Sequence, residues 1–161
     1  METVEVWMWI VAGILIGSII FATAYSLMAN HVKKQELLQA SQGYNQLYEL
    51  INTVCLSGID AMETQRIIFP YIVERIWIED ETGKEEEGKR LCYKIKDKNE
   101  FCQELKLCSA KMRTISFTEK TNLFYLIQKA LGKKEVANIE FKVQKSGLNS
   151  INITWKRRYV K

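Results

Sequence analysis

"METVEVWMWIVAGILIGSIIFATAYSLM" (Met1–Met28) is the stretch that decides the fold of this chain of 161 residues. Its part from Val6 to Met28 is apolar and holds no charged residue. A helix needs about 20 such residues to cross the ~30 Å hydrocarbon core of a bilayer. Aromatic side chains near both ends are typical of membrane interfaces: Trp7, Trp9 and Tyr25. The sequence therefore predicts an anchor over residues 1–30 that crosses the cell membrane once, with the lipid bilayer as its partner.

The start of the anchor is acidic, unlike the start of a secretory signal peptide. Glu2 and Glu5 precede the apolar run, and all 23 Lys and Arg residues lie after residue 30. A signal peptide begins with positive charge and has a shorter apolar core of roughly 7–15 residues. We therefore expect the anchor to remain part of the protein.

The helical pattern continues past the apolar run. Over residues 31–64, apolar side chains recur at steps of three and four, and glutamines occupy the opposite side. The apolar stripe consists of Leu37, Tyr44, Leu47, Tyr48, Ile51, Val54 and Cys55. We expect an amphipathic extension over this range that continues the anchor as one helix, from about Thr3 to Met62, and packs through its apolar face.

Residues 65–161 are expected to form a globular α+β domain. After Pro70 the apolar period changes from near 3.6 to 2, which predicts strands. The strand candidates cover residues 71–80, 91–96, 101–109 and 113–117. A short helix over 122–131 and a terminal hairpin over 137–155 follow. Because clean alternation is typical of antiparallel sheets, we predict a long N-terminal helix packed on a C-terminal antiparallel sheet with one short helix.

This arrangement, a long helix half in lipid and half packed on a C-terminal sheet, resembles type IV pilins and pilin-like proteins. The mark of that family is a glutamate at the fifth position of the mature chain, ahead of a long apolar stretch. Glu5 stands at this position when residues are counted from Met1. The resemblance implies that Glu5 helps to align a subunit with the N-terminal amine of its neighbour during assembly.

Family precursors carry a short basic leader that a dedicated peptidase removes, and none is visible ahead of Met1. Two alternatives stay open. Either the chain begins after cleavage, or Met1 is the original start and the protein is not processed in this way.

Small residues in the anchor bear on its partners. Gly13 and Gly17 form a G-x-x-x-G pattern, which lets two helices approach closely in lipid. We expect the anchor to associate through this face with other pilin-like subunits or other membrane helices.

The side of the membrane on which the domain lies has two interpretations. The resemblance implies a structural subunit, a minor pilin or pseudopilin of a prokaryotic surface filament or secretion assembly, with its domain outside the cytoplasm. Lys33 and Lys34 favour the opposite side, because basic residues that flank a membrane helix tend to stay in the cytoplasm. The alternative is therefore a single-pass adaptor or complex subunit with a cytoplasmic binding domain.

The four cysteines also bear on which side of the membrane the domain lies. Cys55 lies on the apolar stripe and is expected to contribute packing. Cys92, Cys102 and Cys108 fall on polar faces of their expected strands, where free thiols are reactive, so we expect a disulfide. Cys102 with Cys108, or Cys92 with either of them, are the candidate pairs, because spacing does not fix connectivity. A disulfide would indicate a domain outside the reducing cytosol.

Several function classes find no support in the sequence. It holds no phosphate-binding loop, nucleophile elbow or C-x-x-C pair, and its one histidine is His31. We therefore expect no enzyme activity, no cofactor and no metal. Seventeen of the 19 acidic residues also follow residue 30, so that part carries a net charge of +6, which does not by itself indicate a nucleic-acid partner. Asn152 begins an Asn-Ile-Thr sequon and is a candidate glycosylation site on the outward face of the last strand.

Overall fold

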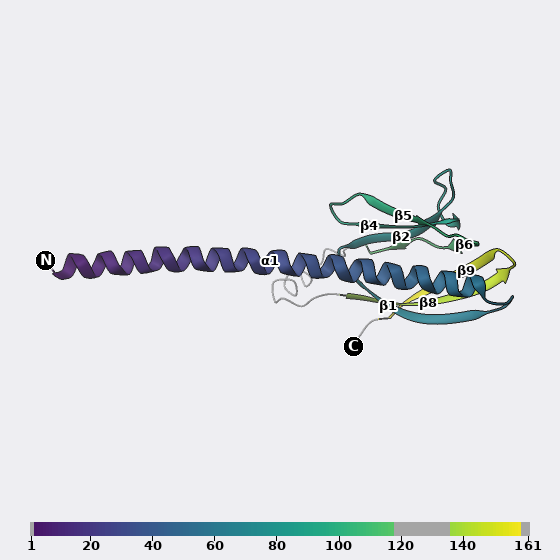
Figure 1. Cartoon of the computed structure of the whole chain (residues 1–161), viewed down its shortest axis with the longest axis horizontal. Helices are drawn as coiled ribbons and strands as arrows, with labels where there is room; N and C mark the ends of the chain where they lie inside the picture. The colour runs from purple at the N-terminus through teal and green to yellow at the C-terminus, as the bar shows by residue number, and fades with distance from the viewer. Residues whose placement is uncertain (1, 118–135, 159–161) are drawn as a thin grey trace. The chain divides into compact units, whose positions relative to one another are not determined.

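The structure is a computed structural model, and it describes residues 2–117 and 136–158 (Figure 1). The short helix expected over residues 122–131 lies outside the described residues. The chain divides into two compact units, Met1–Leu37 and Leu38–Lys161. The first unit is helical throughout its described residues, and the second combines the end of the same helix with two β-sheets.

The predicted N-terminal helix is confirmed. Helix α1 runs without a break from Glu2 to Leu56. It ends six residues before the expected Met62, because the next residues form a turn in which Asp60 adopts a left-handed conformation with φ of 67°. The amide of Ser57 still donates to the carbonyls of Thr53 and Val54, and this bifurcated bond closes the last helical turn.

The first sheet has five strands in the order β1-β8-β9-β6-β3. Their bounds are Met62–Pro70 for β1, Val136–Gly147 for β8, Ser150–Arg158 for β9, Ser109–Met112 for β6 and Glu87–Gly88 for β3. Strands β8 and β9 form the predicted terminal hairpin, with Phe141 opposite Trp155. One expectation was wrong, because strand β1 occupies residues assigned to the helix and the domain boundary. The expected antiparallel arrangement is confirmed for most of the strand pairs, and β6 with β9 is the one parallel pair among the described strands.

The second sheet has four antiparallel strands in the order β5-β4-β2-β7. Their bounds are Glu100–Glu104 for β5, Arg90–Ile95 for β4, Val73–Glu79 for β2 and Ile115–Ser116 for β7. The single strand expected over residues 101–109 is therefore two strands in two sheets. The chain leaves β5 after Glu104 and enters β6 at Ser109.

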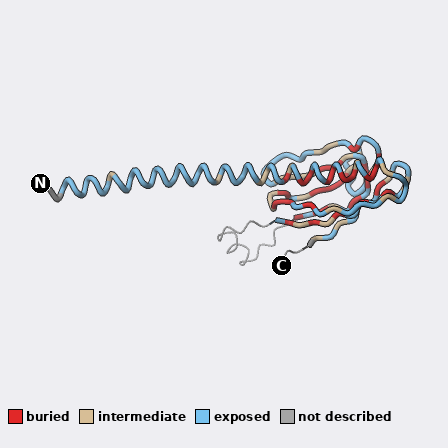
Figure 2. Tube along the Cα trace, turned by 60° about the horizontal axis from the view of Figure 1, so that its bottom comes forward, coloured by how far each residue is buried: buried red, intermediate tan, exposed pale blue. Residues whose placement is uncertain are grey.

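The core of the second unit forms around the Leu38–Leu56 part of α1, which lies between the two sheets (Figures 1 and 2). On one side, the Tyr44 hydroxyl donates to the Leu91 carbonyl at 2.9 Å, and the Tyr48 hydroxyl donates to the Glu104 carbonyl at 3.1 Å. Burial raises the pKa of the Tyr44 phenol, which stays neutral and able to donate. The side chains that close the core from α1 and the first sheet are fully or almost fully buried: Leu47, Ile51, Val54, Ile67, Phe69, Ile139, Phe141, Val143, Ile151 and Ile153.

On the other side of the helix, Gly43 allows α1 to approach β1. A Cβ atom at this position would lie 3.0 Å from Cε1 of Phe69 and 3.1 Å from the carbonyl oxygen of Ile68. Glycine lowers helix propensity by about 1 kcal/mol relative to alanine, and here it permits a backbone contact that a side chain would obstruct.

Candidate functional site

The first unit carries the candidate membrane anchor. Among the described residues, α1 is the one helix that is long and apolar enough to cross a membrane. Its side chains before the second unit are almost all exposed, as the pale blue tube in Figure 2 shows. The hydroxyls of Ser18 and Thr23 donate to the carbonyls of Leu15 and Ile20, so they are satisfied within the helix. Internal satisfaction of polar groups is what a lipid environment requires.

The predicted assembly residues lie along this helix. The exposed Glu5 lies near the N-terminus of α1, where the helix dipole favours a carboxylate. Gly13 and Gly17 are four residues apart, and a Cβ on either would meet no atom within 4 Å. The two glycines therefore lie one turn apart on the same face of the helix, and neither has a side chain that would keep a second helix at a distance.

The structure pairs all four cysteines. The Cys55–Cys108 disulfide joins the last turn of α1 to the segment ahead of β6. The expectation that Cys55 only contributes packing was wrong, and so was the exposed position expected for Cys108. Both are at least 94 % buried, because the chain turns inward after β5 and brings Cys108 to the end of the helix. This bond excludes the candidate pair of Cys102 with Cys108.

The second disulfide joins Cys92 of β4 to Cys102 of β5, one of the pairings left open by the sequence. The two residues are directly opposite each other in the antiparallel register. The exposed position expected for Cys92 was wrong, since it is fully buried. Trp77 lies opposite Cys92 on the neighbouring strand β2 and, by this register, shares its face of the sheet.

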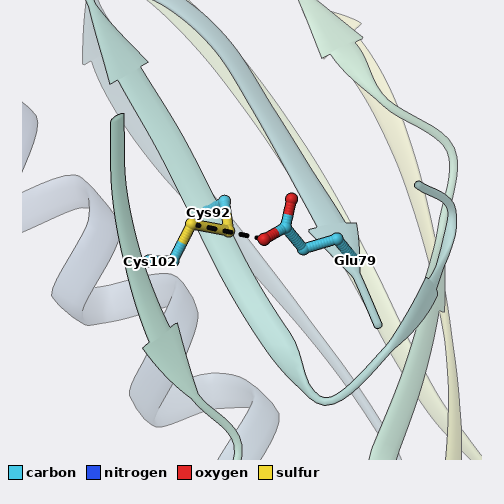
Figure 3. A group of neighbouring side chains, drawn as sticks. All are labelled: Glu79, Cys92 and Cys102. Carbon is cyan, nitrogen blue, oxygen red and sulfur yellow. Dashed lines mark hydrogen bonds between the residues drawn. A yellow bond between two sulfur atoms is a disulfide. The ribbon is translucent and has the colours of Figure 1, made fainter. Parts of the chain in front are cut away.

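A carboxylate approaches this second disulfide (Figure 3). Oε1 of Glu79 lies 3.7 Å from Sγ of Cys102 and 3.4 Å from Nη1 of Arg90. Oε2 of the same group accepts a hydrogen bond of 2.9 Å from the indole nitrogen of Trp77. Because a disulfide sulfur carries no proton, the contact with Cys102, dashed in Figure 3, becomes a hydrogen bond only if that sulfur is a thiol. We call Glu79, Cys92 and Cys102 the sulfur–carboxylate cluster.

The cluster consists of residue types that bind metal ions, two cysteines and a glutamate, but it is not a metal site while the disulfide is intact. One ligand atom from each residue lies within 4.8 Å of the others, and within residues 2–117 and 136–158 it is the one such group of His, Cys, Asp or Glu. Zinc binds the thiolate form of cysteine, which the disulfide does not offer. Nothing in the spacing of these residues along the chain indicates this group, because the strand register brings it together.

An arginine covers the same face of the sheet. The Arg75 guanidinium lies 4.1 Å above the Trp77 ring and pairs with Glu85 at 3.0 Å and Glu100 at 2.8 Å. The hydrogen bond to Glu100 is the main cause that raises the pKa of Arg75. This layer explains why Trp77 is 1 % exposed although it faces away from the helix side of the sheet. The spacing of Arg75, Trp77 and Glu79 at steps of two was the available clue that they share a face.

The candidate glycosylation residue Asn152 lies on β9, between Gln144 of β8 and Lys111 of β6. Asn152 and Thr154 are both exposed, on the face of the first sheet that lies opposite the buried Ile151 and Ile153. Modification of Asn152 stays a prediction.

A hollow around β3 is lined mostly by charged residues of the segment 80–89, which includes this short strand. Within it, Asp80 accepts hydrogen bonds from the amide and hydroxyl of Thr82 and from the amide of Lys84, at 2.7–2.9 Å. These bonds, led by that of the Thr82 hydroxyl, lower the pKa of the Asp80 carboxyl. They order the loop from within, as in an Asx-turn.

Comparison with known proteins adds no further assignment to these sites. No family model matches this chain, and neither a curated protein nor a solved structure does.

Proposed function

We propose that this protein is a membrane-anchored structural subunit, with a role like that of a minor pilin or pseudopilin in a surface filament or secretion assembly. The observation that carries the proposal is the continuity of α1. One unbroken helix supplies both an apolar stretch long enough to cross a bilayer and the central helix of a two-sheet domain. A helix of this kind couples a membrane-embedded assembly contact to a folded domain.

The two disulfides support an extracytoplasmic domain. Disulfides persist outside the reducing cytosol and are rare within it, with hyperthermophiles as the exception. Cys55–Cys108 and Cys92–Cys102 leave no cysteine of the chain unpaired. In this proposal, Glu5 aligns each subunit with its neighbour, and Gly13 and Gly17 bring the anchors close together. No reaction, cofactor or nucleic-acid partner is assigned to the protein.

The second candidate is a single-pass adaptor with a cytoplasmic domain. It is favoured by Lys33 and Lys34, which follow the apolar stretch and fit the positive-inside rule. The two candidates differ in the side on which the cysteines lie. Mass tagging of thiols by a membrane-impermeant reagent in intact cells, with and without prior reduction by an impermeant phosphine, separates them. Tagging that depends on the phosphine supports the extracytoplasmic domain, and tagging only after lysis supports the adaptor.

The assembly role is tested by Glu5→Ala, with Glu2→Ala as the matched control because it removes an acidic residue from the same end of the helix. We expect Glu5→Ala to insert into the membrane normally and to lose co-purification or cross-linking between subunits. Glu2→Ala should keep both properties. Normal subunit cross-linking by Glu5→Ala would refute the role of Glu5.

A further inference from the structure

We propose that the sulfur–carboxylate cluster becomes a zinc-binding site when the Cys92–Cys102 disulfide is reduced. This inference goes beyond the function proposed above and does not rest on it. Zinc binds thiolate sulfur at about 2.3 Å and carboxylate oxygen at about 2.0–2.2 Å. Because the candidate donor atoms already lie within 4.8 Å of one another, small side-chain rotations suffice to place all three around one ion.

The sheet fixes the three positions independently of the disulfide. Glu79, Cys92 and Cys102 come from the three neighbouring strands β2, β4 and β5. Cys92 is opposite Cys102, and Glu79 is two residues along β2 from the partner of Cys92, so all three share one face. The ladder hydrogen bonds hold this arrangement after the sulfur–sulfur bond is broken.

The carboxylate is already oriented for such a site. The Glu79 side chain is 14 % exposed, and the Trp77 indole holds Oε2 at 2.9 Å. Oε1 is directed toward the sulfur of Cys102 (Figure 3), and it also pairs with Nη1 of Arg90 at 3.4 Å, a contact that a bound zinc ion would have to replace. Outer hydrogen bonds of this kind orient metal ligands and are worth roughly 10–100-fold in affinity.

A reductant attacks one of the two sulfur atoms in preference to the other, because they differ in solvent exposure. Cys92 is fully buried and Cys102 is half-buried, so the thiolate of a dithiol reductant attacks Sγ of Cys102. The Cys92–Cys102 bond breaks, and Cys92 leaves as a thiolate that takes up a proton. The second thiol of the reductant then attacks its own sulfur in the mixed disulfide. This step releases Cys102 as a thiol, and the reductant leaves as a disulfide that has supplied two electrons and two protons.

Zinc then stabilises a group of charges that repel one another without it. Two thiolates beside the Glu79 carboxylate place three negative charges in one group, with the Arg90 guanidinium 3.4 Å from the carboxylate as the neighbouring positive charge. A divalent cation offsets this repulsion and releases the two thiol protons to solvent. Glu79 and Cys102 are both partly exposed, so solvent water would supply the fourth ligand.

The experiment uses the full chain in detergent micelles, reduced with a phosphine that is then removed under nitrogen, and titrated with Co²⁺ as a spectroscopic probe for zinc. We expect thiolate-to-cobalt charge-transfer absorption that saturates at one ion per chain and is displaced by Zn²⁺. The oxidised protein should show no such absorption. Glu79→Gln should weaken Co²⁺ binding by at least about tenfold, as expected for loss of an oriented ligand.

Two variants serve as controls. Glu104→Gln removes a carboxylate that lies two residues from Cys102 on the same strand but outside the cluster, and it should bind Co²⁺ like the unmodified chain. Cys55→Ala/Cys108→Ala removes the other pair of sulfurs and should keep the absorption. Absence of the absorption in the reduced chain, its loss in Cys55→Ala/Cys108→Ala with the fold retained by circular dichroism, or unchanged affinity in Glu79→Gln would each overturn the proposal.

Discussion

The ammonium group of Lys145 lies 2.6 Å from the carbonyl oxygen of Cys55 and also donates to the carbonyl of Ser57. Lys145 belongs to β8, is 7 % exposed, and reaches the C-terminal end of α1 from the first sheet. The last turn of α1 contains no basic residue of its own. Lys145 therefore satisfies carbonyls that have no partner within the helix, and it places a positive charge at the negative end of the helix dipole.

We expect Lys145→Met to destabilise the second unit by about 1–3 kcal/mol, the usual cost of leaving buried acceptors without a donor. Methionine keeps most of the side-chain volume, so the loss reports the hydrogen bonds and the charge. Lys142→Met is the matched control, because Lys142 lies on the same strand with an exposed side chain. Urea denaturation of the full chain in micelles, followed by tryptophan fluorescence, gives both values. Equal losses in the two variants would contradict the capping role.

Gly43 supplies a second test of how α1 packs in the second unit. Gly43→Ala gains up to about 1 kcal/mol of helix propensity, but the new Cβ would press on the Phe69 ring and on the Ile68 carbonyl. Since the carbonyl belongs to the strand backbone, it yields less readily than a side chain, and overpacking costs about 1–3 kcal/mol. We therefore expect a lower urea midpoint for Gly43→Ala. Gly58→Ala, where a Cβ meets no atom within 4 Å, should leave the midpoint unchanged or raise it.

The long helix and the terminal hairpin could be predicted from the sequence because each carries one strong period over many residues. Strand β1 could not, since "METQRIIFP" (Met62–Pro70) follows the helical stripe without an intervening proline. Its alternation becomes clear only toward its end, where Ile67 and Phe69 are buried on either side of the exposed Ile68. Glycine often ends a helix, and Gly58 lies closer to the observed end of α1 at Leu56 than Met62 does.

The sulfur–carboxylate cluster was beyond prediction for a different reason. The alternation of "LCYKIK" places Cys92 with Lys94 and Lys96, which indicates an exposed face. Burial of Cys92 depends on Trp77 and Arg75 of another strand, so it follows from strand register and not from local pattern. In the same way, Cys55 meets Cys108 only because the chain changes sheets between β5 and β6.

The two disulfides should differ in their contribution to stability. They close loops with sequence separations of 53 residues for Cys55–Cys108 and 10 residues for Cys92–Cys102. If a disulfide stabilises the fold by lowering the entropy of the unfolded chain, Cys55–Cys108 contributes about 1.5 kcal/mol more stability than Cys92–Cys102. We expect Cys55→Ala/Cys108→Ala to lower the free energy of unfolding by about that much more than Cys92→Ala/Cys102→Ala does. Urea denaturation under non-reducing conditions measures the difference, and a larger loss from the Cys92–Cys102 pair would contradict the ranking.

The ordered 80–84 loop should give stability a defined dependence on acid pH. Hydrogen bonds from the Thr82 hydroxyl and from the Lys84 and Thr82 amides lower the pKa of Asp80 in the folded chain. A lowered folded pKa means that the contribution is fully present above the unfolded value of about 3.9 and is lost as pH falls through the folded pKa. Below about pH 4, the urea midpoint of Asp80→Asn should therefore fall less steeply with decreasing pH than that of the unmodified chain. Glu81→Gln, on the same loop, is the matched control and should keep the profile, because it leaves the three hydrogen bonds to Asp80 in place. Urea midpoints measured at half-unit intervals of pH test this, and an Asp80→Asn profile that runs parallel to that of the unmodified chain throughout the acid range would show that the loop contacts do not favour the ionised carboxylate.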